Sequence, residues 1–182
     1  MSSAKLVSLD ELQSIINLVR DSPKDGGALR MIVLRLPEEG RQVVSRAMLT
    51  VEGGVAGDRW GLKANANPLT QVSVMNSRFL KAISHDDSAM ELAGDNLIVD
   101  LDLHEQNTPP GTRLRIGNVL LEVTPEPHTG CAKFLRRYGK AAYDLTYTPE
   151  GSVMHLRGVL ARVIQGGEVQ VGDLIQKENP AA

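Results

Sequence analysis

Short apolar runs alternate with turn-forming residues along most of the chain. From Leu29 onward, runs rich in Val, Ile and Leu are separated by Gly, Pro, Asn and Asp. Runs bounded in this way are typical of β-strands. Many short strands with frequent turns favour a barrel or a sandwich over a doubly wound sheet. The predicted strands cover residues 29–36, 41–52, 70–75, 97–101, 113–116, 119–123, 158–164 and 173–177.

Three segments have helical spacing instead. Near the N-terminus, Ser8 is followed three residues later by Glu11, which is a capping-box pattern and predicts a helix over residues 8–20. Breakers between Ser22 and Gly27 end this helix. Two further helices are predicted over residues 76–83 and from Cys131 to about Tyr138. The apolar face of the first helix comprises Leu9, Leu12, Ile16 and Val19.

The turns and the domain limits follow from the same pattern. Gly117-Asn118 predicts a tight hairpin, and Gly166-Gly167 is expected to play a similar part. The fold class is therefore mostly β with a few helices (α+β). We expect an N-terminal helix and linker over residues 1–28, one main domain over residues 29–177, and a flexible tail over residues 178–182.

Composition narrows the class of protein. A chain of 182 residues fits one domain, and its net charge of -2 and aromatic content of 3% argue against nucleic-acid binding. No run is apolar and long enough for a signal peptide or a membrane span, so we expect a cytoplasmic protein without a membrane partner. The single cysteine allows no internal disulfide and no metal site that needs several thiolates.

That cysteine, Cys131, is the first candidate for chemistry. It stands where a predicted helix begins, after a stretch stiffened by prolines and closed by Thr129-Gly130. The positive end of the helix dipole and the unpaired N–H groups there favour a thiolate. His128 and Lys133 lie close in sequence and are expected to add positive charge or to move a proton.

A structural interpretation of Cys131 stays open beside this one. A lone cysteine is usually a small buried apolar residue, and Cys131 has helical spacing to Phe134, Leu135 and Tyr138, which resemble a core face. The opposite face is either solvated or an anion site. It carries Lys133, Arg136, Arg137 and Lys140.

A second candidate is the glycine-rich loop that contains Gly57, Asp58 and Arg59. It is either an anion- or cofactor-binding loop or a turn pinned by an Asp–Arg pair. It is not a phosphate-binding P-loop, because the Gly-Lys-Ser/Thr ending is missing. The histidines lack zinc-site spacing. Four polar residues lie in or beside the apolar strands: Gln71, Asn96, Arg157 and Asp173. Such residues more commonly form hydrogen bonds within the core than bind a ligand.

Taken together, these blocks resemble the MOSC family, named for the C-terminal domain of molybdenum cofactor sulfurase. The resemblance runs from about Val51 to Ile175, with its pieces in the family's order, and the form of the segment around Cys131 is similar to the small stand-alone bacterial members. The matching pieces are Gly57-Asp58-Arg59, Thr70-Gln71-Val72-Ser73, Asn96-Leu97, the segment from Pro110 to Gly117, Glu122-Val123-Thr124 leading to Cys131, Arg157-Gly158-Val159, and the segment from Gly166 to Asp173.

The resemblance implies a β-barrel-like fold and a cysteine that carries sulfur as a persulfide or ligates the molybdenum of the pterin cofactor. We expect a catalytic role for Cys131, with His128 and Lys133 as its helpers because they lie close to it in sequence. Sulfur would come from a partner, a pyridoxal-phosphate-dependent cysteine desulfurase, and a molybdenum-cofactor enzyme is a second expected partner. The residues it places at the cofactor are Gly57, Asp58, Arg59, Gln71, Asn96, Thr129 and Arg157.

One departure from the family pattern concerns the cofactor site. Many members have arginine and glutamate before the asparagine, whereas this chain has Gly94-Asp95-Asn96 and lacks that anion-binding arginine. Three hypotheses stay open: a molybdenum-cofactor protein, including a reductase of N-hydroxylated compounds that works with separate electron-transfer domains; a sulfur carrier; and a binding module with an inert cysteine. Oligomeric state is left open.

Overall fold

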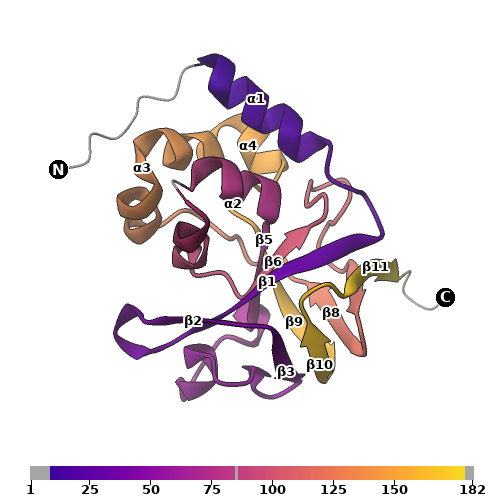
Figure 1. Ribbon diagram of the computed structural model, residues 1–182. Coiled ribbons are helices and arrows are strands. Elements are labelled where there is room, and N and C mark those ends of the chain that lie inside the picture. Colours follow the sequence, from indigo (N-terminus) through magenta and orange to yellow (C-terminus); the bar gives the residue numbers. More distant parts are fainter. Residues whose placement is uncertain (1–8, 85, 179–182) are drawn as a thin grey trace.

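Seven strands close into a mixed barrel in this computed structural model, which describes residues 9–84 and 86–178 (Figure 1). The last strand of the ring pairs with the first, through Gly27 and Ile175, so no edge is left between them. One neighbouring pair is parallel, β5 with β6, and the others are antiparallel. In ring order the strands are β11 (Leu174–Glu178), β7 (Arg113–Ile116), β8 (Val119–Val123), β9 (Val159–Gln165), β5 (Val72–Asn76), β6 (Leu97–Asp100) and β1 (Gly27–Arg35).

The predicted α+β class and barrel are confirmed, with local differences. The predicted strand 41–52 is two strands, β2 (Arg41–Val44) and β3 (Arg46–Thr50). β2 extends the ring beside β1, whereas β3 forms a small second sheet with β10 (Gly167–Gln170) and β4 (Gly54–Val55). The Gly117-Asn118 hairpin is confirmed between β7 and β8. The hairpin expected at Gly166-Gly167 is wrong, because β10 pairs with β3 rather than with β9.

The helices gather on one side of the barrel, in the upper half of Figure 1. The predicted cap Ser8 lies outside the described residues. α3 runs well beyond the predicted end near Tyr138, because Gly139 adopts φ 84° and kinks the helix instead of ending it. The helices are α1 (Leu9–Arg20), α2 (Ser77–Ile83), α3 (Ala132–Tyr147) and α4 (Pro149–Val153), with 3-10 turns η1 (Pro37–Glu39), η2 (Arg59–Leu62), η3 (Pro68–Thr70) and η4 (Asp87–Ala93).

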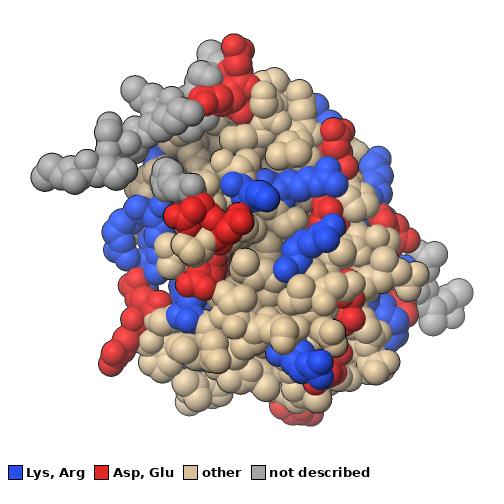
Figure 2. Space-filling model, viewed as in Figure 1, with Lys and Arg blue, Asp and Glu red and all other residues tan. Residues whose placement is uncertain are grey.

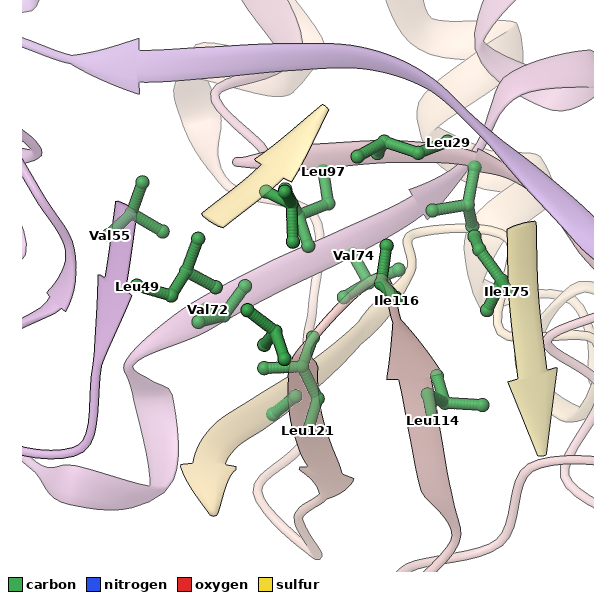
Figure 3. Close-up of a cluster of buried hydrophobic side chains, with 14 of the residues drawn as sticks. Leu29, Leu49, Val55, Val72, Val74, Leu97, Leu114, Ile116, Leu121 and Ile175 are labelled. Atoms are coloured by element: carbon green, nitrogen blue, oxygen red, sulfur yellow. The ribbon is translucent and has the colours of Figure 1, made fainter. Parts of the chain in front are cut away.

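Two apolar cores follow from the alternation of side chains along the strands. In β6, Leu97 and Val99 face the barrel interior, while Ile98 between them packs under the helices. Figure 3 shows the interior side chains of several strands pointing toward one another. The barrel is thus filled by its own side chains, and a ligand site must lie outside it.

The second core joins the helices to the outer face of the barrel. Ile16 and Val19 of α1 pack into it together with Phe79 and Leu80 of α2 and Phe134 of α3. Each fully buried side chain of this size contributes about 1.5–3 kcal/mol relative to exposure. None of the helices within residues 9–84 and 86–178 is both long and apolar enough to cross a membrane.

Candidate functional site

Cys131 is exposed, so the interpretation of this residue as a buried core thiol is wrong. It is the N-cap of α3, with extended backbone (φ −110°, ψ 171°), and its side chain makes no capping hydrogen bond. Because it precedes the first helical residue, it does not share the buried face of Phe134 and Tyr138. Leu135 was expected on that face and is instead 38% exposed. The sulfur is available to a ligand or a partner.

Aromatic residues from the far half of α3 hold the backbone just before Cys131. The hydroxyl of Tyr147 donates to the carbonyl of Gly130 at 2.7 Å. A Cβ at Gly130 would lie 3.1 Å from the ring of Tyr143, so only glycine fits there without a shift. The kink at Gly139 allows the second half of α3 to reach back to its own start. This clamp fixes where the thiol is presented.

A buried polar cluster of Asp95, His128 and Arg157 lies beneath this segment. Nη1 of Arg157 donates to Oδ2 of Asp95 at 2.7 Å, and its guanidinium lies 5.0 Å from the ring centre of Phe134. Nδ1 of His128 lies 3.5 Å from Oδ1 of Asp95. Neither of these two atoms has a hydrogen-bond partner among the described residues.

The charge state of His128 follows from this setting. Burial first, and then the positive charge of Arg157, lower the pKa of His128 to about 4, although the negative charge of Asp95 opposes the shift. His128 is therefore neutral near pH 7 and adds no positive charge beside Cys131. Lys133, the other expected helper, is bound to Glu39, with Nζ 2.7 Å from Oε1.

The Gly57-Asp58-Arg59 loop is pinned by an Asp–Arg pair, but the arginine is Arg35 of β1 and not Arg59. The buried Asp58 carboxylate accepts from Nη2 of Arg35 at 2.7 Å and from the backbone N–H of Trp60 at 2.9 Å. Burial alone would raise the pKa of Asp58, but the hydrogen bonds and charge of Arg35 outweigh it and lower the pKa.

Asn96 and Gln71 connect strands by hydrogen bonds in the core, the commoner role for such residues. Nδ2 of Asn96 donates to Asp58 at 2.9 Å, and its Oδ1 accepts from the backbone N–H of Ser73 at 3.2 Å. Gln71 donates to the carbonyl of Val51 at 2.6 Å and accepts from the N–H of Val163 at 2.8 Å. Both side chains are used by the scaffold. Asp173 serves a turn, where it accepts from the N–H of Gln170.

Arg41, Arg59 and Arg137 form a basic cluster. The Nε of Arg41 is buried without a hydrogen-bond partner in the described part of the chain. Burial first, then the charges of Arg137 and Arg59, lower the pKa of Arg41. Arg137 pairs with Glu39 at 2.9 Å, but Arg59 has no ion pair within residues 9–84 and 86–178. Figure 2 shows Lys and Arg side chains beside acidic ones on the surface over α3.

A cleft of about 290 Å³ lies between the β8–α3 loop, α4 and the start of β9. We call it the α4 cleft. Of the predicted site residues, His128, Thr129 and Arg157 line it, and its wall ends at Gly130, next to Cys131. Gly57, Asp58, Arg59 and Asn96 are not among its lining residues, and Gln71 lines a separate cavity beside Trp60. The structure thus brings only part of the predicted set together.

Residues 58–176, more than half of the sequence, match the MOSC domain. The chain belongs to the MOSC family. No functionally curated protein matches the sequence.

Several solved structures share this fold at low sequence identity. A hypothetical protein is 23% identical with a TM-score of 0.60, over 87% of this chain and 71% of its own. YuaD from Bacillus subtilis is 15% identical with a TM-score of 0.58, over 86% of this chain and 97% of its own. YiiM from Escherichia coli is 22% identical with a TM-score of 0.56, over 85% of this chain and 71% of its own. At these identities the likeness establishes the fold alone.

Within this MOSC domain, sequence reasoning missed the partners that complete the site. Arg35 and Arg41 were read only as strand residues, and Tyr147 fell outside the predicted helix. Glu39 has backbone φ 63°, and nothing in its local sequence marks it as the carboxylate that would meet α3. These contacts join residues far apart along the chain, so local patterns do not contain them.

Proposed function

We propose that this MOSC protein binds the molybdenum cofactor, with Cys131 as the metal ligand. The observation that carries the proposal is the exposed thiol of Cys131, held at the start of α3 by the Tyr147–Gly130 hydrogen bond. Thiolate is a soft ligand that suits a metal of this kind, whereas a hydroxyl is harder and stays protonated.

The basic cluster supports an anionic ligand nearby. Arg59 has no carboxylate partner among the described residues, and the buried Nε of Arg41 has no acceptor there. Buried N–H groups normally have a hydrogen-bond acceptor. An anionic group of the cofactor would supply both the negative charge that Arg59 lacks and an acceptor for the Nε of Arg41. Arg41 and Arg59 would therefore hold its negative charge, while Cys131 would hold the metal. When bound, the cofactor would supply redox chemistry at the metal.

Asp95 bears on the departure from the family pattern. This carboxylate binds Nη1 of Arg157 and offsets its charge, while the Nε of Arg157 is buried without a partner among the described residues. We therefore assign the negative charge of the anion to the basic cluster, whose Arg59 has no carboxylate partner there. Asp58, Asn96 and Gln71 position strands and loops around the site rather than contacting a ligand through free groups.

The test is metal and pterin content of protein purified from a host that makes the cofactor. We expect molybdenum and pterin fluorescence in the wild type, loss of molybdenum in Cys131→Ser, and reduced pterin content in Arg59→Ala. Lys140→Ala is the matched control, because Lys140 is exposed and its one ion pair among the described residues is with Asp144, one helical turn away. Wild-type protein without metal or pterin would overturn the proposal. Loaded protein can then be assayed for reduction of N-hydroxylated compounds.

The exposure of Cys131 favours a second candidate, a sulfur carrier. An accessible thiol without a capping bond can accept sulfane sulfur from a cysteine desulfurase that carries pyridoxal phosphate. Mass spectrometry after incubation with a desulfurase and cysteine would show an added sulfur on Cys131. Retained sulfur without molybdenum would favour this role over cofactor binding.

A further inference from the structure

The α4 cleft contains two carboxylates without cationic partners. Glu105 and Glu126 both line it, and neither forms an ion pair within residues 9–84 and 86–178. The lining cation, Arg157, is neutralised by Asp95. The lining His128 is neutral near pH 7, because burial and Arg157 lower its pKa. The cleft therefore carries net negative charge, opposite in sign to the basic cluster.

His155 adds a ring nitrogen to the same cleft. Its Nδ1 lies 2.7 Å from the carbonyl oxygen of Leu103. A carbonyl only accepts, so Nδ1 carries the hydrogen, and Nε2 is the ring nitrogen left to accept one from a ligand. Nε2 is not among the buried atoms, and it has no hydrogen-bond partner in the described part of the chain.

The backbone of His155 is held in a costly conformation. Its φ is 47°, in the left-handed region that a residue with a Cβ enters at a cost of about 1–2 kcal/mol. Such outliers persist where surrounding structure imposes them and are concentrated at ligand sites. Here the Leu103 contact and the hydrogen bond from Gly158 N–H to the His155 carbonyl, 2.7 Å long, impose it.

We propose that the α4 cleft binds a small organic cation with N–H donors, through Nε2 of His155 and the carboxylates of Glu105 and Glu126. A hydrogen bond between a charged N–H group and a carboxylate is about twice as strong as one between neutral groups. Nε2 of His155 would accept a further hydrogen bond from the ligand. The volume of about 290 Å³ is at the small end for ligand sites and limits the ligand to a few heavy atoms beyond its charged group. The inference is independent of cofactor binding at Cys131.

The experiment compares ethylguanidinium with ethylurea, which has nearly the same shape and no charge. Amide chemical shifts of the protein are followed during titration with each probe. We expect saturable shifts around residues 152–158 with ethylguanidinium and at least about tenfold weaker binding of ethylurea, since a charged hydrogen bond accounts for such a ratio. Equal binding of the two probes, or no saturation with ethylguanidinium, would overturn the proposal.

Amino-acid substitutions test whether His155, Glu105 and Glu126 are the residues that bind ethylguanidinium. His155→Asn keeps a residue that tolerates the left-handed backbone and removes Nε2. The pair Glu105→Gln and Glu126→Gln removes charge without removing volume. Each is expected to weaken ethylguanidinium binding about tenfold, whereas Glu150→Gln, on α4 but outside the cleft lining, leaves it unchanged. If His155→Asn does not fold, the glutamine pair decides, and unchanged affinity there refutes the site. Molybdenum content, measured on the same samples, reports separately on Cys131.

Discussion

Arg157 and Asp95 form a buried ion pair, in which Nη1 of Arg157 lies 2.7 Å from Oδ2 of Asp95 and the side chains are 8% and 0% exposed. Arg157 precedes β9, and Asp95 precedes β6. The pair therefore joins two parts of the site that are far apart in sequence. Removing one member of such a pair is costly, because the other charge stays buried without compensation.

Asp95→Ala is expected to lower the free energy of unfolding by about 3–5 kcal/mol, measured by urea denaturation. The double variant with Arg157→Leu should be less destabilised than Asp95→Ala alone, since it leaves no uncompensated charge. A loss below about 1 kcal/mol in the single variant would show that the pair is not buried in solution.

Acid should destabilise the protein through His128. In the unfolded chain this histidine takes up a proton near its ordinary pKa of 6.5, whereas in the folded protein the pKa is about 4. Between these values the unfolded state binds more protons, so stability is full above about pH 6.5 and falls as the pH drops toward 4. The loss is on the order of 3 kcal/mol.

The measurement is the free energy of unfolding at several pH values in this window. His128→Asn should flatten the slope there, because it removes the group that titrates. The acid loss below the window persists in the variant, because the lowered pKa of Asp58 makes its contribution disappear only as the pH falls below about 4. An identical slope in wild type and variant would contradict the assignment to His128.

Asp58 and Arg59 are adjacent in sequence, but Asp58 is bound within the scaffold and Arg59 is not. Substitutions at these two positions therefore give a matched comparison of stability. Asp58→Ala leaves the partly buried Arg35 without its carboxylate and removes the acceptor for Asn96, so a loss of about 3–5 kcal/mol is expected. Arg59→Ala should change stability by less than about 0.5 kcal/mol, since Arg59 has no ion pair among the described residues. Thermal and urea unfolding of both variants check this. Equal losses would show that Arg59 is part of the scaffold.

Cys131 should react in the native protein. Because its side chain is exposed, iodoacetamide is expected to modify it without prior unfolding, and Cys131→Ser should shift stability by less than about 0.5 kcal/mol. Intact mass against time in native buffer and in urea gives the two rates. A thiol that reacts only in urea would mean that α3 covers it in solution.

Local patterns predicted much of the fold because the turns are explicit. β7 and β8 were predicted at their observed limits, since Gly117-Asn118 separates two apolar runs of strand spacing. β4 and β10 were missed because each is defined by pairing with β3, which lies far from β10 in sequence.

The site was less predictable. Helical spacing placed Cys131 on the core face, but spacing applies only inside a helix, and Cys131 is in extended backbone before it. The sequence suggested that Asp58 forms an ion pair with its neighbour Arg59. In the structure its ion-pair partner is Arg35, which lies 23 residues upstream. His155 had no distinguishing neighbours, and its role depends on the carbonyl of Leu103, which only the tertiary structure brings near.

The closure of the barrel has a consequence for biosynthesis. β1 emerges early from the ribosome, but its partner β11 contains Ile175 and Leu174, close to the end of the described chain. Until β11 is made, the facing edges of β1 and β7 have unpaired backbone groups, which are templates for association with other chains. Native protein should therefore accumulate only after β11 has been made, and nascent chains stalled before residue 174 should be substrates for chaperones.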